Sequence, residues 1–402
     1  MSWPELDPDT PFGLANLPYA VFDPGDGRRR VGVAVGSSVL DAGAAAEAVG
    51  APFAELLAGP SLDPLLGAGR PAWTRVRTGI AEWLTDPAAA DRVRPHLHPR
   101  DRMTLHLPFT VGDYVDFYAS EHHASNVGRM FRPNSDPLTP NWKHLPIGYH
   151  GRSGSVVVSG TDVVRPCGQR KGPNDPAPVF GPSIRLDIEA EVGFVVGAGS
   201  PMGSTIPVAD FAEHVFGVFL LNDWSARDLQ AWEYVPLGPF LGKSFATSIS
   251  PWVVPLDALA AARVAPPVRD PEPLPYLRDY GDWGLDLALE VRLNGHVISR
   301  PPFRTMYWTP AQMLAHTTVN GAPTRPGDIY ASGTVSGPER AQRGSLLELS
   351  WSGTEPITLP DGSSRTFLED GDAVAISATA PGPGGTRIGL GEVTGTVRPP
   401  RA

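Results

Sequence analysis

Apolar and polar residues alternate in several segments of the last three quarters of the chain. From Ser183 to Val192 every second residue is apolar and most of the others are charged, a period of two that indicates a β-strand. The same alternation runs from Leu285 to Leu293, and Asn294-Gly295 follows as a typical two-residue hairpin turn. Further strands are predicted over 30–41, 215–221, 346–351, 373–378 and 387–397.

Segments with helical periodicity are fewer. Apolar residues recur every three or four positions in 72–84, and an Ala-rich helical pattern over 44–57 is interrupted near its middle by glycine and proline. In the rest of the chain, helices are expected after Asp113, after Asp223 and from Thr309, where a capping residue precedes a proline. Strands are therefore predicted to dominate beyond the first hundred or so residues.

A polar segment with proline and histidine, 92–108, separates these two patterns. We predict an amino-terminal domain over 1–105 and a larger domain over 106–402, because a chain of 402 residues exceeds the usual size of one domain. The predicted fold class is mainly β (α+β). The larger domain is expected to be a sandwich, a roll or a distorted barrel.

The amino-acid composition disfavours some classes of binding partner. The 33 basic and 43 acidic residues give a net charge of −10, which disfavours binding to nucleic acid and to anionic membranes. No stretch approaches the roughly 20 apolar residues that span a bilayer. Cys167 is the single cysteine, so no internal disulfide can form and a cytoplasmic location is expected.

Two carboxylates on one predicted strand are the first candidates for chemistry. Glu189 and Glu191 are two positions apart, so their side chains project from the same face of the strand. The simpler interpretation is a solvated face, shared with Arg185 and Asp187. The alternative is a site for a hard divalent cation, Mg²⁺ or Ca²⁺, which takes several oxygen ligands and needs no cysteine.

A second set of polar residues follows a predicted strand. Asp223, Arg227, Gln230 and Tyr234 are spaced by 4, 3 and 4 residues, which places them on one face if they belong to a helix. This face is either an exposed polar surface behind a capping aspartate or a site for an anionic substrate.

Histidine supplies a third candidate. Asp116 and His123 are seven residues apart, or two helical turns, so a helix would present both on one face. A base and a metal ligand would then share a cavity, although a single histidine is more often structural. Glu348 lies among leucines in the predicted strand 346–351, and that pattern alone predicts an exposed side chain.

Several long segments, taken together, resemble the fumarylacetoacetate hydrolase family almost from end to end. They are 16–19, 21–22, 113–128, 140–142, 144–146, 148–152, 222–230, 232–245 and 332–334. The resemblance implies an amino-terminal SH3-like barrel, a carboxy-terminal β-roll domain that bears the active site, and a homodimer. It also implies hydrolysis of a carbon–carbon bond in a dicarboxylate β-diketone, 4-fumarylacetoacetate, to fumarate and acetoacetate. That reaction is the last step of tyrosine and phenylalanine degradation.

The same resemblance implies a metal site and no organic cofactor. The site would hold Mg²⁺, Ca²⁺ or both, and its residues would be Asp116, Glu189, Glu191, Asp223, Lys243 and Thr247. Ala246 stands where the family usually has glycine.

Catalytic and substrate-binding residues follow from the resemblance too. His123 would be the general base and Glu348 the acid that orients it, while Arg227, Gln230 and Lys243 would stabilise developing negative charge. Substrate contacts would come from Tyr118, Arg132, Tyr149, Gln230, Tyr234 and Thr334.

Two other functions fit parts of this pattern. One is a related acylpyruvate hydrolase or decarboxylase of the same superfamily. The other is a non-catalytic protein whose acidic cluster holds a structural Ca²⁺. The length of the resemblance and the pairing of His123 with Glu348 favour the hydrolase.

Overall fold

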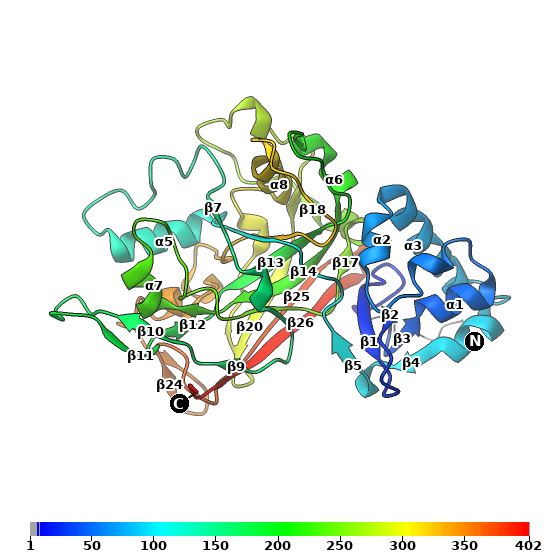
Figure 1. Ribbon diagram of the computed structural model, residues 1–402, viewed down its shortest axis with the longest axis horizontal. Helices are drawn as coiled ribbons and strands as arrows, with labels where there is room; N and C mark the ends of the chain where they lie inside the picture. Colours follow the sequence, from blue (N-terminus) through cyan, green and yellow to red (C-terminus); the bar gives the residue numbers. More distant parts are fainter. Residues whose placement is uncertain (1–5, 8, 402) are drawn as a thin grey trace.

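Two β-rich regions lie side by side in the computed structural model, which describes residues 6–7 and 9–401 (Figure 1). The first contains a five-stranded antiparallel sheet in the order β4-β3-β2-β1-β5. Its strands are β1 Tyr19–Asp23, β2 Arg30–Val35, β3 Ser38–Asp41, β4 Leu97–Pro99 and β5 Thr104–His106. The alternation over 30–41 therefore forms two paired strands. Strand β5 crosses the predicted domain boundary at 105/106, whose position stays a prediction.

The helices of this region are α1 Ala42–Val49, α2 Asp63–Gly67, α3 Arg70–Thr85 and α4 Ala90–Val93. The helix predicted over 72–84 is confirmed as α3, whose buried face consists of Trp73, Val76, Ile80 and Leu84. Helix α1 ends at Gly50, which has a φ of 74°, a left-handed conformation that glycine adopts without strain. The predicted interruption of 44–57 therefore marks a true helix end.

The second region is built on an eight-stranded mixed sheet. Along its main path the order is β7-β6-β22-β13-β14-β16-β8, and β17 pairs with β14. The strands are β6 Tyr114–Phe117, β7 Gly148–His150, β8 Val156–Val158, β13 Ala190–Val196, β14 Val215–Asp223, β16 Thr247–Ile249, β17 Val254–Pro255 and β22 Ile329–Ala331. Strand β22 runs parallel to β6, and β16 runs parallel to β8.

A five-stranded sheet in the order β21-β20-β25-β26-β9 packs beside it. Its strands are β9 Val163–Val164, β20 Ala288–Leu293, β21 His296–Ser299, β25 Ala373–Pro381 and β26 Arg387–Arg398. The Asn-Gly hairpin is confirmed between β20 and β21: Asn294 has a φ of 50° and Gly295 one of 82°, the two positive values that a type I′ turn requires.

Short paired strands complete the β structure. They are β10 Cys167–Arg170 with β11 Val179–Pro182, β12 Leu186–Asp187 with β15 Ser225–Ala226, β18 Arg263–Val264 with β19 Gly284–Leu285, and β23 Ile357–Thr358 with β24 Ser364–Arg365.

The two large sheets share one apolar core. Val218 and Leu220 of β14 are buried in it together with Leu289 of β20 and Ile376 of β25, so removal of this apolar surface from water holds the sheets together. The helices of this region are α5 Glu121–Phe131, α6 Phe211–His214, α7 Arg227–Glu233, α8 Pro310–Thr318 and α9 Leu346–Leu349. The predicted start of α8 is confirmed, because Thr309 forms a capping box with Gln312. No helix among residues 6–7 and 9–401 has both the length and the hydrophobicity needed to cross a bilayer.

Three predictions about the elements that carry candidate residues were wrong. The segment from Leu346 is helix α9, not a strand, because the cap Ser345 and the carboxylate of Asp187 bind its first amide groups. The helix expected after Asp223 is present as α7, but Asp223 ends strand β14 and does not cap that helix, because β16 pairs with β14 as far as this residue. Asp116 lies in β6, so it does not share helix α5 with His123.

The charged face predicted for 183–192 is not solvated. This segment forms β12, a break at 188–189 and then β13, which lies between β14 and β22 in the sheet. Asp187, Glu189 and Glu191 are all buried, so the simpler interpretation of this strand face was wrong.

Candidate active site

Four carboxylates converge where strands of the eight-stranded sheet end. Asp116 comes from β6, Glu191 from the start of β13, Asp223 from the end of β14, and Glu189 from the break before β13. One oxygen from each lies within 4.8 Å of the others, and all four residues are buried. Burial, reinforced by the neighbouring negative charges, raises the pKa of Asp116 and of Glu191 well above the ordinary carboxyl value.

Several oxygens of this cluster lack a donor. Asp116 Oδ1, both carboxylate oxygens of Glu191 and Asp223 Oδ1 are buried and have no hydrogen-bond partner among the described residues. Uncompensated buried charges of this kind cost several kcal/mol each. Hard oxygen ligands in a compact, protein-enclosed set suit Mg²⁺ or Ca²⁺, so the residues present fit a divalent cation.

Lys243 neutralises one side of the cluster. Its Nζ lies 2.6 Å from Glu189 Oε2 and 2.6 Å from Asp223 Oδ2. Although burial opposes ionisation of Glu189, the Lys243 and Arg227 cations lower the pKa of this carboxyl below its usual range. The Tyr149 hydroxyl donates to Asp223 Oδ2 at 3.1 Å. Lys243 thus pairs with two of the four carboxylates, while Asp116 and Glu191 form no ion pair with the residues that the structure describes.

His123 and Glu348 form the second part of the site. His123 Nδ1 lies 2.6 Å from Glu348 Oε2, and Glu348 is fully buried. Glu348 also accepts hydrogen bonds from Asn126 Nδ2 at 2.9 Å, from Ser336 Oγ at 2.9 Å and from Ser345 Oγ at 3.0 Å. Burial opposes ionisation of Glu348, but His123, Asn126 and Ser336 lower its pKa. The expectation of an exposed Glu348 was therefore wrong, and the pairing with His123 is present.

Asp187 joins the two parts. Its carboxylate accepts hydrogen bonds from the backbone N–H groups of Leu346 and Leu347 at 2.7 and 3.0 Å, which fixes the start of the helix that carries Glu348. The Asp187 carboxylate also accepts a hydrogen bond from Arg227 Nε at 2.8 Å. Arg227 Nη1 lies 2.7 Å from Glu189 Oε1. Arg227 therefore bridges Asp187 to the carboxylate cluster, and its Nη2 is buried with no hydrogen-bond partner in the described part of the chain.

The predicted substrate contacts lie at different depths. The Tyr118 ring packs edge-on against His123, with centroids 5.3 Å apart, and Gln230 Oε1 accepts from Arg227 Nη1 at 3.3 Å. Thr334 is buried, and its hydroxyl has no partner among the described residues. Tyr118 and Gln230 therefore contact the two parts of the site directly.

The remaining predicted residues lie at the edge of the site or against the acidic cluster. Arg132 follows α5, is exposed and donates to the carbonyl of Pro137. Tyr234 follows α7 one turn after Gln230 and is 51% exposed. Thr247 pairs with Asp223 across β16 and β14 and is buried. The Tyr234 backbone N–H donates to the Gln230 carbonyl at 3.0 Å, and among the described residues its hydroxyl forms no hydrogen bond with another candidate.

Sequence analysis missed the residues that hold Glu348 and Arg227 in place. Asp187 was assigned to a solvated face, and Asn126, Ser336 and Ser345 were not considered. Asp187 precedes Glu189 by two positions on the same alternating strand pattern, which was the available signal. Ser336 and Ser345 had no such signal in the sequence. Their role depends on contacts with Glu348 of helix α9, which the local pattern did not predict.

Fold and site together define a two-domain β-protein with a buried carboxylate cluster beside a histidine–glutamate pair. Residues 114–398 match the family model described as fumarylacetoacetate (FAA) hydrolase C-terminal, and residues 15–108 match fumarylacetoacetase N-terminal. The chain therefore belongs to the fumarylacetoacetate hydrolase family.

Relatives span the whole chain. It is 47% identical over 415 residues to the fumarylacetoacetase of Homo sapiens, covering 99% of both chains. The identity to the fumarylacetoacetase of Arabidopsis thaliana is 45% over 415 residues, covering 99% of this chain and 98% of the relative.

Solved structures show the same fold at lower identity. A fumarylacetoacetate hydrolase from the psychrophile Exiguobacterium antarcticum aligns with a TM-score of 0.56 at 18% identity, over 95% of this chain and 99% of that one. A maleylpyruvate hydrolase from Sphingobium aligns with a TM-score of 0.52 at 17% identity, over 95% of this chain and 100% of that one.

Proposed function

We propose that the protein is a hydrolase that cleaves 4-fumarylacetoacetate with water to give fumarate and acetoacetate, the last step of tyrosine and phenylalanine degradation. The full-length identity to fumarylacetoacetases, 41–47% over 99% of the chain, supports this activity. The observation that carries it is the buried contact of His123 with Glu348 at 2.6 Å, next to a carboxylate cluster that could hold a metal ion.

A divalent cation, Mg²⁺ or Ca²⁺, is part of this proposal. Asp116, Glu189, Glu191 and Asp223 would hold it, with Lys243 and Thr247 beside them. When bound, such an ion supplies Lewis-acid polarisation of a diketone oxygen. Support comes from the unpartnered oxygens of the cluster, which are the ligands that a hard cation takes.

His123 is proposed to activate water. Because Nδ1 is engaged by Glu348, Nε2 is the nitrogen left to accept the proton, and Glu348 stabilises the imidazolium that forms. General-base catalysis of this kind contributes roughly 10²- to 10⁴-fold. The hydroxide adds to the fumaryl carbonyl carbon. The bond to the neighbouring methylene carbon then breaks, and that carbon keeps the electron pair and takes up a proton.

Developing negative charge requires donors that are not already occupied. Arg227 Nη2 is buried and has no partner among residues 6–7 and 9–401, so it is the strongest candidate to bind the oxyanion, with Gln230 and Lys243 close by. One donor of this kind is worth about 3 kcal/mol. Tyr118, Arg132, Tyr149, Tyr234 and Thr334 are proposed to contact the substrate, with Arg132 binding a terminal carboxylate.

The alternative functions have weaker support. An acylpyruvate hydrolase or decarboxylase shares the acidic cluster, but the relatives above are fumarylacetoacetases over the full length of the chain. A non-catalytic Ca²⁺-binding protein would need the acidic cluster alone and would leave the His123–Glu348 pair unexplained.

One assay tests the activity. Fumarylacetoacetate absorbs in the ultraviolet, and this absorbance is expected to disappear with the purified protein and Mg²⁺, to persist after chelation and to disappear again when Mg²⁺ is restored. No loss of absorbance at any concentration of Mg²⁺ or Ca²⁺ would contradict the proposed hydrolase.

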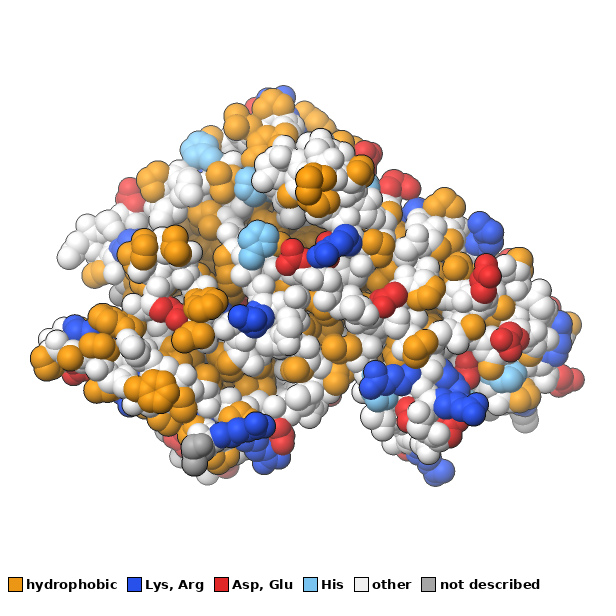
Figure 2. Space-filling view, viewed as in Figure 1, with side chains coloured by type: hydrophobic (Ala, Val, Ile, Leu, Met, Phe, Trp, Pro, Cys, Tyr) orange, Lys and Arg blue, Asp and Glu red, His pale blue; other side chains and the backbone are white. Residues whose placement is uncertain are grey.

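We also propose a homodimer in the cytoplasm. Large apolar side chains are exposed on β11 and after α7, where Phe180 is 78% and Leu237 is 97% exposed. Figure 2 shows apolar side chains gathered over the β10–β11 hairpin. Exposed apolar groups of this kind are typical of protein–protein contact surfaces. Light scattering after gel filtration measures the mass directly, and a single-chain mass would contradict the dimer.

A further inference from the structure

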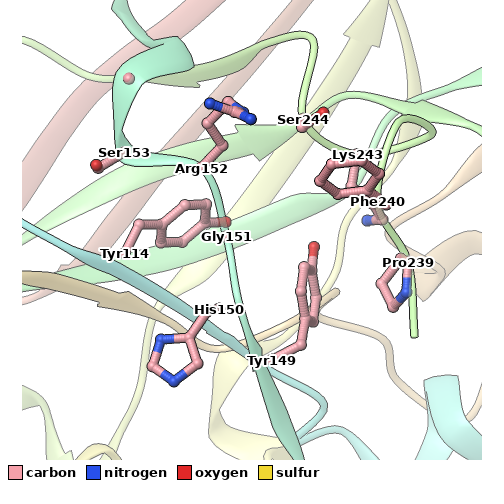
Figure 3. A pocket seen from close by; sticks show the side chains of 11 residues that line it. Tyr114, Tyr149, His150, Gly151, Arg152, Ser153, Pro239, Phe240, Lys243 and Ser244 are labelled. Atoms are coloured by element: carbon pink, nitrogen blue, oxygen red, sulfur yellow. The ribbon is translucent and has the colours of Figure 1, made fainter. Parts of the chain in front are cut away.

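A cavity of about 480 Å³ opens beside the acidic cluster and is lined in part by Tyr149, Arg152, Lys243 and Ser244 (Figure 3). Tyr149 and Lys243 both contact Asp223, so the cavity reaches the carboxylates proposed to hold a cation. Neither residue of the His123–Glu348 pair lines it. The cavity therefore approaches the site from a direction that does not include the proposed base.

Arg152 is the unengaged cation of this cavity. Within the part of the chain that the structure describes, its guanidinium makes no hydrogen bond or ion pair, and no acidic residue lines the cavity. Lys243 differs, because Glu189 and Asp223 both hold its Nζ at 2.6 Å. Figure 3 shows the Arg152 side chain extending toward Ser244, with Tyr149 and Lys243 on the other side of the cavity. An anion that enters would meet Arg152 free of competing carboxylates.

The backbone fixes this arginine from both sides. Gly151 N–H donates to the Tyr114 carbonyl at 2.9 Å, and a Cβ at Gly151 would lie 2.3 Å from a carbon of the Tyr114 ring. Only glycine allows the chain to pass so close to this ring. After Arg152, Ser155 N–H donates to the Arg152 carbonyl at 3.2 Å. The backbone is therefore held in place while the guanidinium stays available.

We propose that Arg152 binds the second terminal carboxylate of the substrate. This inference rests on the proposed function, whose substrate has a carboxylate at each end, whereas Arg132 provides a cation for one of them. A guanidinium binds a carboxylate through two parallel hydrogen bonds, a geometry that lysine cannot reproduce. Arg152 would thus select dicarboxylates over β-diketones that carry a single carboxylate.

Binding of suberate tests the subsite without the reaction. Suberate has the same number of chain carbons as the proposed substrate and a carboxylate at each end. Calorimetry with the Mg²⁺-loaded full chain is expected to show suberate affinity about tenfold lower for Arg152→Met than for the wild type, because one charged hydrogen-bonded contact is lost from an open site. Arg75→Met is the matched control, since Arg75 is an exposed arginine on α3, away from the site, and it is expected to bind suberate as the wild type does.

Kinetics give the second readout. For fumarylacetoacetate, Arg152→Met is expected to raise KM about tenfold and to leave kcat within about twofold, because the residue binds a part of the substrate remote from the reacting bond. Arg152→Lys should recover only part of the loss. Equal suberate affinity in wild type and Arg152→Met, or no suberate binding by the wild type, would overturn the subsite. Absence of hydrolysis by the wild type would contradict the proposed function and leave the suberate result to decide the subsite by itself.

Discussion

Two sets of buried carboxylates lie in the same site and have opposite surroundings. Glu348 receives three hydrogen bonds from neighbouring side chains besides its contact with His123, and its pKa is lowered. Asp116 and Glu191 are equally buried but have oxygens without donors, and their pKa values are raised. Since burial is common to both, the difference in pKa comes from the neighbours: His123 and hydrogen-bond donors surround Glu348, whereas Asp116 and Glu191 lie beside other carboxylates. The protein's own side chains neutralise Glu348, whereas the cluster is proposed to be completed by a cation.

Removal of the cation should therefore have the largest effect. Chelation is expected to reduce hydrolysis to background, because the carboxylates of the cluster would then be unneutralised. It should also lower stability, since saturation at about 100 times the dissociation constant adds about 2.7 kcal/mol. Activity and thermal unfolding, measured before chelation, after chelation and after Mg²⁺ is restored, check both effects. Full activity in the chelated protein would show that the carboxylate cluster does not need a cation.

Loss of the base comes next. His123→Ala is expected to lower kcat by roughly 10²- to 10⁴-fold and to leave the Mg²⁺-induced rise in melting temperature in place, because His123 is not one of the four carboxylates. Circular dichroism controls for folding. Near-normal turnover by a folded His123→Ala protein would show that the proposed base is wrong.

A smaller effect is expected at the residue that joins the two sets. Asp187→Asn removes the charge that holds Arg227 Nε and weakens the capping of α9, so kcat should fall about tenfold, which corresponds to about 1.4 kcal/mol. Addition of Mg²⁺ should still raise the melting temperature of Asp187→Asn. Loss of that gain would mean that Asp187 serves the cluster and not the positioning of Arg227 and Glu348.

The smallest effect concerns stability alone. In the metal-free protein, Glu191→Gln is expected to raise the free energy of unfolding by on the order of 1 kcal/mol, because a buried negative charge without a donor is removed. A carboxyl whose folded-state pKa is raised favours the folded state at low pH and loses that contribution as pH rises through the raised value. Metal-free wild type should therefore lose stability with rising pH more steeply than Glu191→Gln. Denaturant unfolding across a pH series measures both, and identical slopes would contradict the raised pKa.

Local sequence patterns predicted much of the fold. The Asn294-Gly295 hairpin, the capped start of α8 and the apolar face of α3 all depend on residues close together in the chain. Helix α9 was missed because its first amides bind Asp187, which lies 159 and 160 residues earlier. The extension of β14 to Asp223 was missed because it depends on pairing with β16.

The site was predictable only in part for the same reason. The two-residue spacing of Glu189 and Glu191 predicted that both side chains lie on one face of a strand. It did not decide whether that face is exposed to water or binds a cation. The inclusion of Asp116 and the roles of His123 and Glu348 came from the resemblance to a family, because no local period relates residues from separate strands. The catalytic and substrate-binding roles stay predictions until the variants above are measured.

The pairing of His123 with Glu348 spans 225 residues. During synthesis the imidazole therefore leaves the ribosome long before its carboxylate partner exists, and so do Asn126 and all four carboxylates of the cluster. A chain interrupted before α9 would contain the whole acidic cluster and would still lack an oriented base. The order of synthesis therefore makes the carboxylate partner of His123 the last part of the site to appear.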